Sequence, residues 1–460
     1  MSMFALIVSQ VLALALGAGI TAQLIRRSAG SVAAIGGYGY VLGLVAMTLV
    51  LRALSFIGIA WSFWLPASIA VGLSIVAFAL ARTRWRDAPL VVANDLAAWQ
   101  RWLVVLLWAL ICVHVGFALV EALLRPLFPW DAAAQWATKA RVWFQYRRIV
   151  PFVDDMTWIG LTGDVFTDAH PTYPGTVPLF QVWAALAWGS FDDATINLGW
   201  PLFLAASAFG IYGGLRRLAF APLPAVAVAY VVTSLPFVDV HAALAGYADL
   251  AVAVVYAFAW LAFAAWTRER TVRNAALTLL CAFCLPLLKT PGWVWLGTLM
   301  PGIAALYLSP RILRWLAAAG AVVALAVVLY ATYVRPVTII GYQVAPQQAR
   351  VIDALASNFF LFANWHLLGL LLPFALLVAR RALFVPMMLP ITVVAGTAVA
   401  ALMIVFFFTS ASVEGVGAYT TVNRAALHVV PALVIYVAIL WHEYWQMRTS
   451  AVDGTAIAAA

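Results

Sequence analysis

An acid, an amide and a cation are spaced four residues apart in an otherwise apolar stretch of this sequence. Asp131, Gln135 and Lys139 follow Pro129, so a helix that begins at this proline would carry all three on one face. A carboxylate can take a proton from a hydroxyl group, and a cation can stabilise a phosphate leaving group. With tryptophans beside this face, the spacing indicates a juxtamembrane helix, on which Asp131 is a candidate base and Lys139 a candidate cation. The alternative is a helix that Asp131 caps, with Lys139 in solvent.

A second group of candidates follows in the same polar region. His170 and Tyr173 belong to the segment HPTYPG, in which two prolines favour a stiff, extended backbone. His170 is a candidate for contact with a bound ligand, or for a metal site with Asp131 and Asp249. Tyr173 is a candidate for stacking on a ligand. The alternative for both residues is an ordinary turn that serves loop packing.

Four cations are candidates for binding a phosphate. They are the only two lysines of the chain, Lys139 and Lys289, and two arginines, Arg141 and Arg424. Arginine suits bidentate contact with phosphate oxygens, and lysine acts as a point charge. The alternatives are that Arg141 anchors a helix at the membrane interface and that Arg424 extends its charge out of the membrane from a helix end.

An acid also begins one of the apolar runs. Asp249, two residues after Tyr247, stands where a charge is unfavourable unless it faces a cavity or a partner. This position favours a place in a binding site, with Tyr247 beside it. The alternative is a carboxylate that only stabilises the start of a helix through the helix dipole.

The composition excludes a soluble protein. Hydrophobic residues make up 66% of the chain, charged residues 9%, and the mean hydropathy is +1.01, whereas soluble domains are about 25% charged. The net charge of +9 fits arginines retained on one side of a membrane better than nucleic-acid binding. We therefore expect an all-α polytopic membrane protein that has the lipid bilayer, and no nucleic acid, as its partner.

A membrane crossing needs about 20 apolar residues, and about thirteen runs approach this length. They lie at 4–25, 33–55, 58–81, 100–123, 197–215, 222–237, 248–266, 274–288, 292–309, 315–333, 358–378, 385–408 and 425–442. Arginines gather in every second connection, and the positive-inside rule makes these connections cytoplasmic. The N-terminus is then expected outside and the C-terminus in the cytoplasm, in the inner membrane of a bacterium.

The opposite, exoplasmic face receives the long polar connections, at 124–196, 334–357 and 409–424. The first of these is too long for a passive linker, so we expect juxtamembrane helices and the functional site there. The chain accordingly divides into four parts. These are three N-terminal helices (1–95), a catalytic membrane module (96–300), C-terminal helices (301–445) and a cytoplasmic tail (446–460).

Three short motifs join the first exoplasmic loop in pointing to one family. The sequence has GYADL at 246–250, LKTPG at 288–292 and TVNRAALH at 421–428. Together with an aspartate after a span and a His-Pro-x-x-Pro-like stretch, these motifs resemble the GT-C superfamily of integral-membrane glycosyltransferases. Over about 125–442 the chain is similar to the bacterial branch related to dolichyl-phosphate-mannose-protein mannosyltransferases and lipid A aminoarabinose transferases.

The resemblance implies a GT-C-like fold and an inverting transfer of a sugar from a polyprenyl phosphate to an acceptor hydroxyl on the periplasmic face. It assigns Asp131 as general base and the four cations to the donor phosphate. The remaining candidates would contact sugar or acceptor: Gln135, His170, Tyr173, Tyr247 and Asp249.

The chain departs from the family pattern in three ways. The catalytic loop follows the fourth apolar run rather than the first, so residues 1–95 are read as additional helices. Asp131 is followed by alanine, which weakens the case for a divalent metal held by paired acids. His170 stands where the aminoarabinose transferases have lysine. We therefore expect no cofactor, and metal binding stays undecided.

Two other functions compete with this hypothesis. A transporter or flippase of lipid-linked saccharides would carry ionisable residues at mid-membrane depth, and His114 is the clearest such residue here. A polysaccharide polymerase or ligase would also use exoplasmic arginines. The acceptor of a glycosyltransferase would be a glycan, a lipid or a protein.

Overall fold

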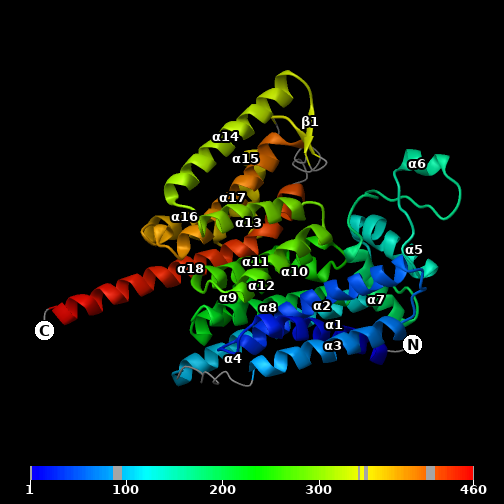
Figure 1. The fold of residues 1–460 in the computed structure, drawn as a ribbon, viewed down its shortest axis with the longest axis horizontal. Coiled ribbons are helices and arrows are strands. Elements are labelled where there is room, and N and C mark those ends of the chain that lie inside the picture. Colours follow the sequence, from blue (N-terminus) through cyan, green and yellow to red (C-terminus); the bar gives the residue numbers. More distant parts are fainter. Residues whose placement is uncertain (1–2, 86–95, 340–341, 347–350, 411–419, 459–460) are drawn as a thin grey trace.

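The computed structural model is built almost entirely from helices (Figure 1) and describes residues 3–85, 96–339, 342–346, 351–410 and 420–458. The N-terminal part contributes four long helices: α1 (Met3–Leu24), α2 (Ser31–Phe56), α3 (Trp64–Trp85) and α4 (Ala98–Leu124). Each is apolar over a length that a membrane crossing requires.

The predicted loop at 124–196 contains short helices, and their place beside a membrane stays a prediction. Its elements are a π-helix η1 (Ala132–Ala137), α5 (Thr138–Tyr146), α6 (Asp155–Gly160), α7 (Thr176–Trp188) and a 3-10 helix η2 (Thr195–Asn197). Helix α7 is buried over almost its whole length. In Figure 1 these elements gather at one end of the bundle, near the N-terminus of the chain.

The centre of the bundle is formed by six further helices. They are α8 (Gly199–Arg217), α9 (Pro222–Thr233), α10 (Pro236–Ala243), α11 (Ala248–Arg268), α12 (Val272–Leu288) and α13 (Gly292–Ala305). Helix α11 is apolar all round and buried from Ala248 to Thr267, as expected of a helix surrounded by other helices. It packs against α8, α12 and α18.

The C-terminal part contains α14 (Pro310–Tyr333), the strands β1 (Val337–Ile339) and β2 (Tyr342–Val344), α15 (Val351–Ala356), a π-helix η3 (Ser357–Leu361), α16 (Leu368–Val378), a 3-10 helix η4 (Ala382–Phe384), α17 (Met388–Phe408) and α18 (Thr420–Ala458). In Figure 1 the elements from α14 to α17 lie above the centre of the bundle, whereas the last helix, α18, runs from the centre toward the C-terminus at the left. The strands pair antiparallel, with Thr338 opposite Gln343.

Fewer helices are long and apolar enough to cross a membrane than the thirteen runs suggested. Nine helices in the described ranges meet both criteria, or ten if the bent pair α9 and α10 forms one span. Three other predicted runs correspond to shorter helices. Helix α12 has 17 residues and α13 has 14, hence about 25 Å and 21 Å at 1.5 Å per residue, and the run 358–378 is divided between η3 and α16. The orientation of the termini stays a prediction.

Close helix contacts hold the N-terminal helices together. A side chain on Gly43 would place its Cβ 1.7 Å from the Ala13 carbonyl oxygen, and one on Gly17 would lie 1.8 Å from the Gly39 carbonyl oxygen. Helices α1 and α2 can therefore approach only because these positions lack side chains, which is typical of helix contacts in membranes.

Substitution at one of these glycines tests the contact. Gly43→Ala should lower the midpoint of thermal unfolding of the purified protein, because relieving the clash with Ala13 separates two helices, and overpacking costs about 1–3 kcal/mol. Gly36→Ala on the same helix is the matched control, since nothing lies within 4 Å of its Cβ position. Equal unfolding midpoints for the two variants would contradict the close packing.

Candidate functional site

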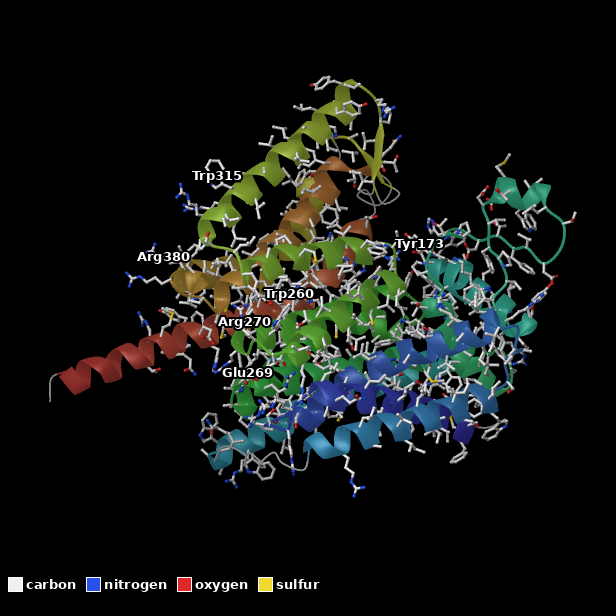
Figure 2. All side chains as sticks on the ribbon, viewed as in Figure 1. Tyr173, Trp260, Glu269, Arg270, Trp315 and Arg380 are labelled. Carbon is white, nitrogen blue, oxygen red and sulfur yellow. The ribbon has the colours of Figure 1, made fainter. Side chains whose placement is uncertain are left out.

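Seven of the residues singled out by the sequence line one polar cavity. The cavity has a volume of about 410 Å³ and lies where α11, α13 and α18 begin and α12 and α17 end. The predicted residues on its wall are Asp131, Gln135, His170, Tyr173, Asp249, Lys289 and Arg424. Figure 2 labels Tyr173 at this end of the bundle. Residues from the first loop and from a helix almost 300 positions later therefore share one site.

A fully buried carboxylate is the centre of this site. Asp249 is 0% exposed, and its Oδ1 accepts hydrogen bonds from Lys289 Nζ at 2.7 Å and from His428 Nε2 at 2.9 Å. Its Oδ2 accepts one from Arg424 at 3.0 Å. A carboxylate without water is tolerated only when cations and hydrogen bonds surround it, and these three side chains supply both.

Arg424 joins this carboxylate to the predicted base. One terminal nitrogen of Arg424 donates to Asp249, and the other donates to Asp131 Oδ2. The guanidinium also lies 4.8 Å from the ring centre of Tyr247, where the ring face attracts the cation. The rigid fork of arginine donors suits such bridging. Asp131 and Arg424 keep about a third of their side-chain surface exposed, so both can meet a ligand in the cavity.

Helix ends explain how these charges meet. Asp249 lies in the first turn of α11, where the helix dipole favours an acid. Lys289 follows the last residue of α12, and Gly292 then begins α13. A Cβ on Gly292 would lie 2.1 Å from the Leu285 carbonyl oxygen, so only glycine permits the close turn that directs Lys289 toward Asp249.

The π-helix η1 changes the face that the predicted helix presents. A π-turn contains more residues than an α-turn, so residues beyond η1 are rotated away from the stripe that α-helical spacing would give. Asp131 and Gln135 reach the cavity, whereas Lys139 does not. The prediction that all three residues share one face of a helix was therefore wrong for Lys139.

Gln135 has an unused donor on the cavity wall. Its side chain is 2% exposed, and its Nε2 has no hydrogen-bond partner in the described part of the chain. Buried amide donors are nearly always satisfied. A ligand oxygen in the cavity is the partner that this geometry provides for.

Lys139 instead contacts the segment that carries His170, outside the cavity. It is 1% exposed, lies 3.1 Å from Asp168 Oδ2 and donates a 2.7 Å hydrogen bond to the carbonyl oxygen of His170. Burial lowers the pKa of Lys139 and raises the pKa of Asp168, and in both cases the mutual attraction opposes this shift. The pair fixes the backbone at His170, whose ring stacks on Tyr173 at 4.8 Å.

Arg141 lies outside the cavity as well. Its guanidinium is exposed and donates to Asp193 Oδ1 at 2.6 Å. The structure thus brings two of the four predicted phosphate cations, Lys289 and Arg424, to the cavity. The described residues contain no group of three or more His, Cys, Asp or Glu arranged to hold a metal ion, so no metal centre is assigned.

Two residues of the network were not among the predicted site residues. Trp295 Nε1 donates to His428 Nδ1 at 3.0 Å. Because an indole nitrogen only donates, His428 Nδ1 must accept, and its Nε2 carries the proton that is donated to Asp249. His428 could have been found from its spacing, since it lies one helical turn after Arg424. Trp295 is one of many tryptophans and gives no such signal.

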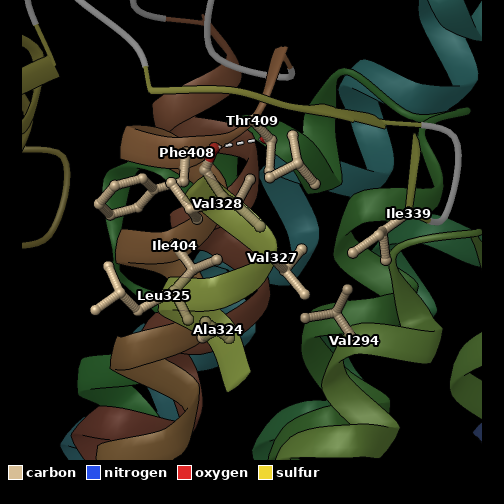
Figure 3. Close-up of a pocket in the computed structure, with 12 residues that line it drawn as sticks. Val294, Ala324, Leu325, Val327, Val328, Ile339, Ile404, Phe408 and Thr409 are labelled. Carbon is tan, nitrogen blue, oxygen red and sulfur yellow. Dashed lines mark hydrogen bonds between the residues drawn. The ribbon is translucent and has the colours of Figure 1, made fainter. Parts of the chain in front are cut away.

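An apolar groove opens beside the polar cavity (Figure 3). It has a volume of about 530 Å³, lies between α13, α14, α17 and the two strands, and is lined almost only by aliphatic side chains such as Val328 and Ile404. Val294 and Val405 line both spaces. A charged site and a hydrocarbon-lined groove are therefore contiguous.

Comparisons of this chain with protein-family models, with curated proteins and with solved structures gave no match.

Removing the central carboxylate tests the network. Asp249→Asn should destabilise the protein by about 3–5 kcal/mol, because it leaves Lys289 as an uncompensated buried cation and removes one of the two acids that pair with Arg424. Asp193→Asn removes an acid from an exposed pair and should cost at most about 1 kcal/mol. Chemical unfolding of the purified variants measures both values.

The double variant Asp249→Asn with Lys289→Met provides the coupling control. Because both members of the pair are absent, it should be more stable than the sum of the two single variants predicts. Additive losses would show that Lys289 and Asp249 do not interact energetically.

Proposed function

We propose that this chain is a membrane glycosyltransferase of GT-C type that transfers a sugar from a polyprenyl-phosphate donor to an acceptor hydroxyl. The observation that carries the proposal is the contact between a cavity lined by two acids and two cations and a groove lined by hydrocarbon. A lipid-linked sugar phosphate has these two chemical parts in the same order.

The proposed reaction is a single displacement. The acceptor hydroxyl oxygen forms a bond to the anomeric carbon of the sugar as the bond from that carbon to the phosphate oxygen breaks. Asp131 takes the hydroxyl proton, and the electron pair of the broken bond leaves with the polyprenyl phosphate. Attack from the face opposite the phosphate inverts the anomeric configuration.

Arg424 is proposed to stabilise the leaving phosphate. In the structure Arg424 donates to Asp131 and Asp249. A phosphate oxygen can replace Asp131 as the partner of one terminal nitrogen, while Asp249 continues to hold the other. The exchange keeps the guanidinium paired and frees Asp131 to accept a proton. Lys289, held by Asp249, adds positive charge on the same wall.

The rest of the cavity provides groups for sugar and acceptor. Gln135 offers its unsatisfied amide donor, and the stacked rings of His170 and Tyr173 form one side of the space. Aromatic faces and amide donors suit the two sides of a sugar ring. The contiguous groove, with a volume of about 530 Å³, accepts several isoprene units. Their burial is favourable, because each Å² of apolar surface removed from water contributes about 25 cal/mol to the free energy of binding.

One observation favours a transporter or flippase as the second candidate. Helices α9 and α10 are bent by 62° at a short break, and Asp239 of α10 lies 3.4 Å from His114 of α4. Broken helices with ionisable partners are typical of transporters.

Transport predicts movement of intact donor, whereas transfer predicts free polyprenyl phosphate and a glycosylated acceptor. Incubating purified protein with a panel of polyprenyl-phosphate sugars and acceptors distinguishes them.

The base is tested by an isosteric change. Asp131→Asn should lower the turnover number about 10²–10⁴-fold, the range for loss of a general base, because the amide cannot take a proton. It should leave the dissociation constant for the lipid donor within a few-fold of the original. Asp193→Asn is the control, because Asp193 is exposed in a pair with Arg141 and does not line the cavity. Turnover of Asp131→Asn equal to that of the control would exclude Asp131 as base.

The proposed role of the groove in binding the prenyl chain is tested by two tryptophan substitutions on helix α14. Ala324→Trp fills the groove from α14 and should raise the KM for a long-chain donor at least severalfold, while a donor with a short prenyl chain is affected less. Ala319→Trp on the same helix is the matched control, because Ala319 is exposed and does not line the groove. Identical donor kinetics for the two variants would refute the assignment of this groove.

A further inference from the structure

A second charged cavity lies at the opposite end of the helix bundle. It has a volume of about 180 Å³ and is lined by Arg26, Arg27, Arg217, Arg268 and Arg273, with Glu269 as its only acid. Helix α11 connects the two ends: Asp249 lies in its first turn and Arg268 is its last residue, about 30 Å away at 1.5 Å per residue. In Figure 2 Glu269 and Tyr173 lie on opposite sides of the bundle.

The arginines converge from three connections that are distant in sequence. Arg26 and Arg27 follow α1, Arg217 ends α8, and Arg268 and Arg273 flank the link between α11 and α12. The positive-inside rule explains why arginines occur on one side of a membrane. It does not require that they line one concave space, so their convergence calls for an anionic occupant.

Part of the cavity wall is held in place by hydrogen bonds within the protein. Arg217 donates to Asn274 Oδ1 at 3.1 Å, and Arg268 donates to the Leu218 carbonyl oxygen at 2.6 Å. The N-terminus of α12, capped by Thr271, also borders the cavity and adds its positive dipole. These groups form a rigid, positive surface before any ligand binds.

Two other arginines remain available to a ligand. The guanidinium groups of Arg26 and Arg273 have no ion-pair or hydrogen-bond partner among the residues that the structure describes. Each offers a planar set of donors that fits phosphate oxygens. Glu269 alone cannot balance the five positive charges around it.

The location of the cavity indicates which kind of molecule would carry the phosphate that it binds. The cavity lies at the ends of α1, α8 and α11, all long and apolar enough to cross a membrane, and lipid headgroups are found at this depth. Leu24, Leu218 and Ala265 give it an apolar side next to the arginines. Basic pockets between membrane helices are suited to anionic headgroups.

We propose that this cavity is a binding site for the phosphodiester headgroup of an anionic membrane lipid, on the face of the protein opposite the polar cavity. The headgroup phosphate lies between Arg26 and Arg273, and the acyl chains leave past the apolar side. This site binds lipid independently of the proposed sugar transfer, so either proposal can fail without the other.

The test measures lipid binding to the full-length protein in uncharged detergent by native mass spectrometry. Phosphatidylglycerol should bind more tightly than phosphatidylcholine and should raise the unfolding midpoint. The double variant Arg26→Gln with Arg273→Gln should weaken phosphatidylglycerol binding about tenfold or more, given the strength of charge-assisted hydrogen bonds. The control Arg380→Gln with Arg381→Gln removes two exposed arginines from another connection and should leave binding within twofold.

Three results would overturn the proposal. Equal losses in the two double variants would show diffuse attraction without a site. Equal binding of phosphatidylcholine would remove the need for an anion. Displacement of phosphatidylglycerol by millimolar inorganic phosphate would assign the cavity to a soluble anion. If the glutamine variant unfolds at a lower temperature without lipid, the lysine pair Arg26→Lys with Arg273→Lys should bind phosphatidylglycerol more tightly than the glutamine pair and less tightly than the original protein, because it keeps both charges but not the planar donor sets. Binding no tighter than that of the glutamine pair would count against the site.

Discussion

The buried carboxylate of Asp249 is the constraint on which the rest of the structure depends. It lies without solvent exposure at the start of a helix that is buried on every side, so it must be surrounded by cations and donors. Lys289, Arg424 and His428 come from the ends of two other helices. Bringing these helix ends together therefore also brings together the charged residues of the cavity.

The sequence predicted the helical class and the acids and cations that line the polar cavity, because membrane proteins place charges under strong constraint. With few ionisable residues among the apolar runs, Asp249, Lys289 and Arg424 could be recognised individually. Their mutual pairing could not, since nothing in the local pattern shows which helix ends meet. Lys139 was misplaced because α-helical spacing was assumed, whereas η1 is a π-helix. Fewer described helices than predicted runs reach the length of a membrane crossing, because α12 and α13 are apolar but short.

The two cavities suggest a division of roles along one axis. At one end a balanced set of charges borders a hydrocarbon-lined groove, an arrangement suited to chemistry on a lipid phosphate. At the other end arginines exceed acids fivefold around a small space, an arrangement suited to holding a phosphate without reacting with it. Helix α11 joins the two, and its complete burial fixes the distance between them.

A structure of the chain with bound polyprenyl phosphate tests the central claim most directly. The account predicts a phosphate oxygen within hydrogen-bonding distance of Arg424, Asp131 released from that arginine, and isoprene units beside Val328 and Ile404. A phosphate bound away from Arg424, with the contact between Asp131 and Arg424 unchanged and the groove empty, would contradict it.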